Sequence, residues 1–173
     1  MITKCAVPAE DAGFERFGAI YDLNCDAKNP DKNVIFSKGS DYKDGYTAAP
    51  VVNRPASIGM TVSSPMPFIA QEMERHLHTW ETLMCISEPV VFLAAPETDG
   101  SLSDNDRPNA EDTVAVILKP GHVAVLNRGV WHSPAHGLKK ESAYYWMAEA
   151  YDDEPTVWRE ILHGPVQVVM EEK

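Results

Sequence analysis

From Ala56 onward the chain consists of short apolar or alternating segments that turn-forming residues separate. These segments cover residues 56–64, 67–76, 81–96, 113–132 and 142–151, and Pro, Gly, Asn or Asp interrupts them. Short runs at this spacing are typical of β-strands that turns connect. Because no long amphipathic helix separates any pair of runs, the pattern argues against a parallel βαβ fold. It predicts a mainly β domain, an antiparallel sandwich or barrel.

The N-terminal third differs in composition and residue pattern from this strand-rich region. Residues 8–21 open with acidic residues and place Phe14 and Phe17 three positions apart, which predicts a short helix of about two turns that ends at Gly18. Residues 26–55 are rich in Asp, Lys, Asn, Gly and Pro, and they predict a loop or arm with one short strand at 34–37.

The C-terminal segment predicts a second helix. Residues 152–164 begin with two Asp residues, place a Pro in the first turn and end at Gly164, which is the pattern of a capped helix. Residues 166–169 predict a last edge strand. We therefore expect one domain over 1–173, with a helix and arm at 1–55, a barrel core at 56–151, and a helix and edge strand at 152–173. Residues 97–112 predict a solvated, acidic hairpin loop within the core.

The composition limits the partners that the protein can have. The 173 residues carry a formal net charge of −11, and the sequence pI is near 4.9. An acidic chain without a basic patch argues against binding to nucleic acid or to an anionic membrane surface. No apolar run approaches the roughly 18 residues of a membrane-spanning helix. Cys5, Cys25 and Cys85 show no CxxC spacing, and the first residues lack the apolar stretch of a secretory signal, so we expect free thiols and a cytoplasmic protein.

The strongest chemical signal lies between residues 72 and 87. His76, His78 and Glu81 fall within six positions, and strand-like residues flank them. Residues two apart on a strand point to the same side, so His76 and His78 are expected to face the interior together. Glu81 can join them only if residues 77–80 turn and Glu81 begins the next strand. Two imidazoles and a carboxylate are typical ligands of a divalent metal ion.

A fourth candidate ligand, His132, lies some fifty residues further along the chain. Turns are predicted at Pro120–Gly121 and at 127–129, and antiparallel strands between them can bring His132 beside His76. The predicted metal set is thus His76, His78, Glu81 and His132, and its chemistry suits Zn, Ni, Mn or Fe. The alternative is a stable β-domain whose histidines are incidental.

These residues together resemble known families. An HxH pair, a nearby Glu, a Pro-Gly turn and a distant His resemble the pattern of the cupin barrel. More closely, GFERFGAIY at 13–21, EMERH at 72–76, FLAAP at 92–96 and NRGVWHSP at 127–134 resemble the ureidoglycolate lyase family. The chain departs from that family at three positions: Glu81 replaces an expected Gln, Asn127 replaces an expected His, and His78 has no counterpart.

The resemblance implies a cupin-like antiparallel β-barrel of the jelly-roll type that forms a homodimer. It implies cleavage of ureidoglycolate, a small anionic substrate, to glyoxylate and urea in allantoin (purine) catabolism. Glu81 and His132 are then the expected catalytic residues. The expected substrate-binding residues are Arg75, Asn127, Arg128 and Trp131, although strand alternation places Arg75 opposite His76, and Trp131 also fits a core position. The alternatives are a metal-dependent cupin that acts on another sugar acid or keto acid, and a non-catalytic module that binds a small molecule.

Overall fold

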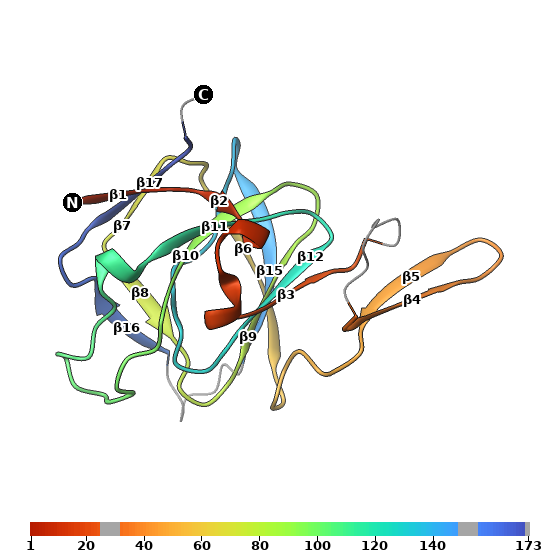
Figure 1. The fold of residues 1–173 in the computed structure, drawn as a ribbon, viewed down its shortest axis with the longest axis horizontal. Coiled ribbons are helices and arrows are strands. Elements are labelled where there is room, and N and C mark those ends of the chain that lie inside the picture. Colours follow the sequence, from red (N-terminus) through yellow and green to blue (C-terminus); the bar gives the residue numbers. More distant parts are fainter. Residues whose placement is uncertain (25–31, 149–155, 172–173) are drawn as a thin grey trace.

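The computed structural model describes residues 1–24, 32–148 and 156–171, and these residues are mainly β (Figure 1). The central sheet has the order β16 (Val157–Glu160), β8 (Glu72–Arg75), β13 (Trp131–His132), β10 (Val90–Ala95), β11 (Val114–Leu118) and β2 (Val7–Pro8), and β14 (His136–Gly137) also pairs with β10. All its pairings are antiparallel except that of β2 with β11.

Three further sheets accompany the central one. A five-stranded antiparallel sheet has the order β3 (Gly18–Asp22), β12 (His122–Leu126), β9 (Glu81–Cys85), β15 (Ser142–Ala148) and β6 (Ser57–Ser63). A three-stranded sheet has the order β1 (Ile2–Cys5), β17 (Val166–Val169) and β7 (Phe68–Ala70). The hairpin of β4 (Val34–Lys38) and β5 (Lys43–Thr47) projects from the body (Figure 1).

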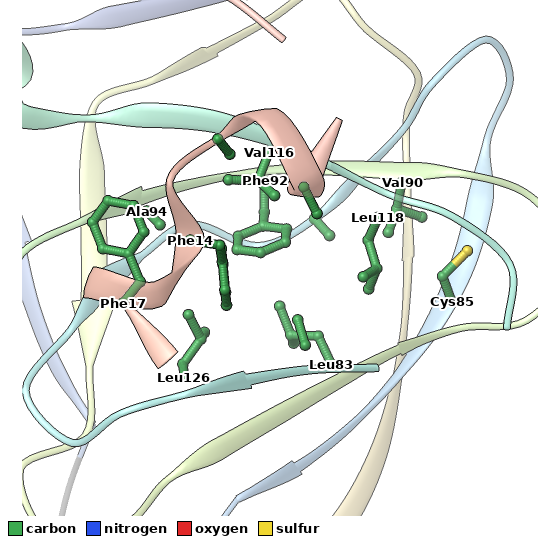
Figure 2. Packing of buried hydrophobic residues seen from close by; sticks show 14 of the residues in the cluster. Phe14, Phe17, Leu83, Cys85, Val90, Phe92, Ala94, Val116, Leu118 and Leu126 are labelled. Carbon is green, nitrogen blue, oxygen red and sulfur yellow. The ribbon is translucent and has the colours of Figure 1, made fainter. Parts of the chain in front are cut away.

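The central sheet lies between two hydrophobic clusters. Every residue of β10 is buried, and alternate side chains enter opposite clusters. Phe92 packs with Phe14, Leu83 and Leu126 between the central and five-stranded sheets (Figure 2). Leu93 belongs to the second cluster, together with side chains of the three-stranded sheet. A strand buried on both sides must be apolar throughout, which explains the uninterrupted VVFLAA sequence.

The prediction of a mainly β, cupin-like fold is confirmed, with one refinement. Over the described residues the strands form facing sheets and not one closed ring of hydrogen-bonded strands. This is the jelly-roll arrangement, in which a core is enclosed between packed sheets. The predicted strands at 34–37 and 166–169 are present, but β17 lies in the middle of its sheet and is not an edge strand.

The predicted N-terminal helix is wrong. Two single 3-10 turns, Ala9–Asp11 and Phe14–Arg16, replace it. Gly13, with φ 60°, separates the two turns, because this left-handed conformation breaks a helical path. Phe14 and Phe17 are nevertheless buried side by side in the core. Their spacing therefore reported burial correctly but not the secondary structure.

The predicted C-terminal helix is also wrong where the structure describes it. Val157–Glu160 form strand β16, which pairs with β8. Val157 is buried whereas Trp158 is partly exposed, which is the alternation of a strand. The two Asp residues and Pro155 of the predicted cap lie outside the described residues.

A third single 3-10 turn, Ala110–Asp112, ends the acidic loop. Over the described residues, no helix is long and apolar enough to cross a bilayer.

Candidate functional site

Four side chains from three strands and one loop form a buried polar cluster. Nε2 of His76 and Nε2 of His132 lie 2.7 and 2.8 Å from the same oxygen, Oε2 of Glu81. Oε1 of Glu74 lies 3.8 Å from His132 Nε2. The exposed fraction of these side chains rises from 2% for His132 through 8% for Glu81 and 10% for His76 to 18% for Glu74. One carboxylate thus holds two imidazoles, and a second carboxylate stands beside them.

Sheet register explains why these residues meet. Glu74 of β8 is directly opposite His132 of β13 on one side and Trp158 of β16 on the other. Directly opposed residues of antiparallel strands point to the same face, so these three side chains form a row across the central sheet. Glu81 comes from the facing five-stranded sheet. The cluster therefore lies where the two sheets approach each other.

The connection from β8 to β9 supplies the remaining geometry. Strand β8 ends at Arg75, and residues 76–80 form an irregular turn before β9 begins at Glu81. The predicted turn is confirmed, and Glu81 faces inward as that turn requires. The backbone N–H of Gly129 donates to the carbonyl of His76 at 2.7 Å. Gly129 has φ 77°, so the predicted turn at 127–129 is present and holds the His76 backbone in place.

Charge interactions within the cluster oppose the effect of burial. Burial alone raises the pKa of the Glu81 carboxyl, but His132 and the hydrogen bonds from both imidazoles lower it to about 2. Burial alone lowers the pKa of His132, yet the Glu81 carboxylate raises it to about 9. Burial raises the pKa of Glu74, and His132 offsets only part of this. At neutral pH, Glu81 and His132 therefore form an ion pair.

The donor set fits a divalent metal ion. Ligand atoms of Glu74, His76 and His132 all lie within 4.8 Å of one another. The Nδ1–H of His132 donates to the carbonyl of Val130 at 3.1 Å, so Nε2 is the nitrogen directed to the cluster. Metal-binding histidines are commonly oriented by a backbone bond of this kind. The residues form a possible metal site, and metal binding there would compete with the protons that bridge the imidazoles to Glu81.

A cavity of ≈ 290 Å³ opens onto the cluster. Glu74, His76 and Glu81 line it, together with aromatic and small side chains from the facing sheet, from β16 and from two residues outside the strands. These others are Thr61, Pro134, Tyr144, Trp146, Ala148, Thr156 and Trp158. Burial raises the pKa of the Tyr144 phenol, and its oxygen accepts a hydrogen bond from the Ala135 backbone. The cavity thus combines one acidic and imidazole-lined end with an aromatic wall.

The structure does not bring His78 to this cluster. Its side chain is exposed in the turn after β8, and its backbone carbonyl accepts a hydrogen bond from Asn53. The expectation that His76 and His78 face inward together is wrong because the strand ends before either histidine. The residue two positions before His76 does share its side, since Glu74 and His76 both line the cavity. The sequence prediction therefore used the correct spacing of two residues but chose His78 in place of Glu74.

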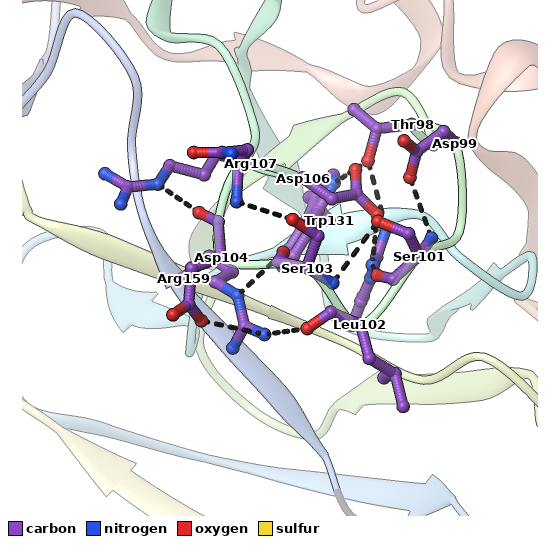
Figure 3. Close-up of polar contacts among 12 residues, drawn as sticks. Thr98, Asp99, Ser101, Leu102, Ser103, Asp104, Asp106, Arg107, Trp131 and Arg159 are labelled. Carbon is purple, nitrogen blue, oxygen red and sulfur yellow. Dashed lines mark hydrogen bonds and ion pairs between the residues drawn. The ribbon is translucent and has the colours of Figure 1, made fainter.

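Arg75 and Trp131 lie on the reverse face and not in the cavity. The Arg75 guanidinium donates to Asp106 at 2.5 Å, to the Ser101 carbonyl at 2.6 Å and to the Thr98 hydroxyl at 3.0 Å. It stacks 4.2 Å above the fully buried Trp131 ring, whose N–H also donates to Thr98 (Figure 3). The expectation of substrate binding by either residue does not fit this position, because both are buried among residues of the 97–112 loop.

The 97–112 loop is correspondingly less solvated than predicted. Asp106 is buried, and although burial raises the pKa of its carboxyl, hydrogen bonds from Thr98 and Arg75 lower it overall. Arg159 of β16 ties the loop down by donating to the Leu102 carbonyl at 2.8 Å (Figure 3). The expectation of a fully solvated acidic surface is therefore wrong for Asp106.

Asn127 and Arg128 lie at a separate surface cleft. Both side chains are exposed, and with Leu77, Trp80 and Glu97 they line a cleft of ≈ 410 Å³ that does not include the cluster. The structure thus brings together His76, Glu81 and His132 of the predicted site residues. It adds Glu74 and the aromatic wall, which sequence reasoning missed. Glu74 could have been found from its position two residues before His76, whereas nothing local marks Tyr144 or Trp146.

Comparison with solved structures finds nucleotide-sugar epimerases of low similarity. An RmlC from Streptococcus suis is 12% identical with a TM-score of 0.39, and the match covers 56% of this chain and 44% of that one. The dTDP-4-dehydrorhamnose 3,5-epimerase of Elizabethkingia anophelis is 12% identical with a TM-score of 0.45, and the match covers 72% of this chain and 73% of that one. The Legionella pneumophila RmlC is 12% identical with a TM-score of 0.47, and the match covers 72% of this chain and 68% of that one. The chain spans less than half the length of the first of these proteins.

Comparison of the sequence with known proteins gives a clearer result. No curated protein sequence matches the chain. The family model described as ureidoglycolate lyase matches residues 2–169, which is nearly the whole chain and includes every residue of the polar cluster. The chain therefore belongs to the ureidoglycolate lyase family.

Proposed function

We propose that the protein is a carbon–nitrogen lyase that cleaves ureidoglycolate to glyoxylate and urea in allantoin catabolism. The observation that carries this proposal is the convergence of Glu74, His76 and Glu81 on one cavity, in a chain that the ureidoglycolate lyase family model matches over residues 2–169. The reaction needs a group that removes a hydroxyl proton and a group that protonates a departing nitrogen. An ionised carboxylate next to two imidazoles can supply both.

The charge of the cluster supports a metal-dependent reaction. Glu74 and Glu81 contribute negative charge, and among the described residues no Arg or Lys side chain lines the cavity to receive the carboxylate of the substrate. Glu74, His76 and His132 would hold a divalent ion. When bound, such an ion would supply positive charge for the carboxylate and hydroxyl oxygens of the substrate.

Glu81 has the properties of the proton carrier. Oε2 accepts hydrogen bonds from both imidazoles, and among the described residues Oε1 has no partner. Oε1 takes the hydroxyl proton of the substrate, and the electron pair of that O–H bond forms the carbonyl of glyoxylate. The C–N bond breaks with its electron pair on the urea nitrogen, which then receives the proton from Glu81. A carboxyl with a pKa of about 2 is ionised at neutral pH, so Glu81 enters the reaction without a proton of its own.

His132 acts on this chemistry through Glu81. Its side chain is 2% exposed and is not part of the cavity lining, so it is a positioning residue in this proposal. The bond from Nδ1 to the Val130 carbonyl sets the orientation of its ring, so Nε2 faces Glu81 Oε2 in the metal-free protein and would face a bound ion in its place. His76, which lines the cavity, holds the same oxygen from the other side.

Product analysis tests the proposal. Purified protein is incubated with racemic ureidoglycolate after treatment with EDTA, and again with Ni²⁺, Mn²⁺, Zn²⁺ or Fe²⁺ added. We expect glyoxylate and urea in equal amounts, with one enantiomer consumed. Release of ammonia in place of urea would indicate hydrolysis of the ureido amide and would contradict a lyase. Absence of glyoxylate with every metal would overturn the proposal.

We also propose that the protein is a cytoplasmic homodimer, as the family resemblance implies. The free thiols of Cys5 and Cys85 are compatible with a reducing compartment. The outward side of β6 supports self-association, because Ile58, Met60 and Val62 are 67%, 57% and 54% exposed. Light scattering after gel filtration tests the dimer, since the expected mass is twice the 19.2 kDa of one chain. A single-chain mass at micromolar concentration would exclude it.

A further inference from the structure

One wall of the cavity is a tryptophan that lies on a glycine. Tyr144 and Trp146 point inward from β15, and both line the cavity. Trp146 is directly opposite Gly59 on β6 and Leu83 on β9. Leu83 is a core residue, which confirms that this side of the sheet faces inward. The indole therefore extends from the core into the cavity.

Gly59 is needed for the position of this indole. A Cβ atom added to Gly59 would lie 2.1 Å from Cζ2 and 2.2 Å from Cε2 of Trp146, closer than real contacts allow. The backbone of Gly59 has no positive φ, so the requirement is for space and not for an unusual conformation. The six-membered ring of the indole consequently packs directly on the β6 backbone. Any larger residue would move the ring.

Thr61 restrains the indole at its N–H group. The indole N–H of Trp146 donates to the Thr61 hydroxyl at 3.2 Å. Thr61 lies two residues after Gly59, so both point to the cavity side of β6. It is also directly opposite Tyr144, the next inward residue of β15. The ring of Trp146 is thus held at its edge by a hydrogen bond and at its face by close packing.

On the basis of the proposed function, we infer that Trp146 determines which substrates the cavity accepts. The hydroxy-acid end of the substrate lies at the cluster, where the ion of the proposed function would offset its negative charge. The planar ureido group then lies against the indole, because a flat, polar amide packs well on an aromatic face. Since Gly59 and Thr61 hold the ring, Trp146 limits the size of any substituent on the terminal ureido nitrogen. It is a specificity-determining residue that no part of the acid–base chemistry requires.

A binding experiment tests this inference without turnover. The probes are N-carbamoylglycine, which lacks the hydroxyl group and cannot be cleaved, and its derivative with a butyl group on the terminal nitrogen. Titration calorimetry is performed on wild type, Trp146→Ala and Gly59→Ala in the same metal solution. We expect wild type to prefer the unsubstituted probe by at least about tenfold, the scale on which apolar pockets discriminate by size. Trp146→Ala should abolish this preference. Gly59→Ala should weaken the binding of both probes, because the added Cβ displaces the indole ring.

Controls separate this inference from general effects. Trp80→Ala removes an indole from the separate cleft of Leu77 and Arg128 and should keep the wild-type preference. If Trp146→Ala does not fold, as judged by circular dichroism, Trp146→Phe should show an intermediate preference. An unchanged preference in the Trp146 variants, or equal or absent binding of both probes to wild type, overturns the inference. Probe binding without cleavage of ureidoglycolate would contradict the proposed lyase and leave the inference standing.

Discussion

The two faces of strand β8 show two different uses of charge. On one face, Glu74 meets His132 beside a cavity, and its carboxyl has a pKa raised by burial. On the other face, Arg75 is fully buried and bonded to Asp106, to Thr98 and to a backbone carbonyl. The reverse face pairs the Arg75 charge with Asp106 within the protein, whereas the cavity face holds carboxylates that a ligand can still engage. Adjacent residues of one strand can therefore have unrelated roles, because their side chains point to opposite faces of the sheet.

The largest expected effect is on the cavity face. Glu81→Ala removes the carboxylate that carries the hydroxyl proton, so we expect kcat to fall by roughly 10²- to 10⁴-fold, the usual range for a general acid–base residue. Steady-state kinetics with ureidoglycolate measure this effect. His78→Ala is the matched control, because His78 is exposed outside the cluster and should keep wild-type kcat. Equal losses in the two variants would contradict the assignment of Glu81.

The reverse face should govern stability more than chemistry. Asp106→Ala leaves the Arg75 guanidinium buried without its ion-pair partner, and breaking such a pair costs roughly 3–5 kcal/mol of unfolding free energy. Urea denaturation measures this loss. Asp104→Ala is the control, since its carboxylate is 91% exposed in a surface pair with Arg159 and should change stability by less than about 0.5 kcal/mol. If Asp106→Ala is as stable as Asp104→Ala, the two faces do not differ as described.

The sequence allowed the strands, the turns and three residues of the polar cluster, His76, Glu81 and His132, to be predicted. Period-2 alternation and turn residues report burial directly, which is why the β-rich core and the turn before Glu81 were found. Helix signals at the two ends failed because tertiary packing decided those segments: Phe14 and Phe17 enter the core from 3-10 turns, and residues after 156 pair with β8. Local capping patterns contain no information on such pairing.

The site predictions failed where a strand end or a distant partner decided the outcome. His78 was predicted inside because the end of β8 at Arg75 is not marked in the sequence. Arg75 and Trp131 were predicted at the substrate because their partners, Asp106 for Arg75 and Thr98 for Trp131, lie 31 and 33 residues away in a loop that was predicted to be solvated. Gly59 opposite Trp146 depends on a strand register between residues 87 positions apart, which one sequence cannot supply.

We expect a metal ion at the cavity face to stabilise the folded protein, with a smaller effect than the changes above. Ni²⁺, Zn²⁺ or Mn²⁺ at 100 times its Kd should raise the unfolding free energy of wild type by about 2.7 kcal/mol, provided that the unfolded chain does not bind it. Thermal unfolding with and without metal, after EDTA treatment, measures the change. His132→Ala should lose this stabilisation and His78→Ala should retain it, because only His132 belongs to the possible ligand set. Retention in both variants would place the metal elsewhere.

The pH dependence of stability isolates the Glu81–His132 pair in metal-free protein. The pKa of His132 is about 9 when folded and near 6.5 otherwise, so its contribution is full below pH 6.5 and is lost as the pH rises through 9. The pKa of Glu81 is about 2 against 4.5, so its contribution is full above pH 4.5 and is lost as the pH falls through 2. The pair is therefore strongest between pH 4.5 and 6.5. From about pH 6 to about pH 9.5, the difference in unfolding free energy between wild type and His132→Gln should shrink by on the order of 3 kcal/mol. Urea denaturation in EDTA at each pH measures it, and a difference that stays constant across this range would show that His132 is not held charged by Glu81.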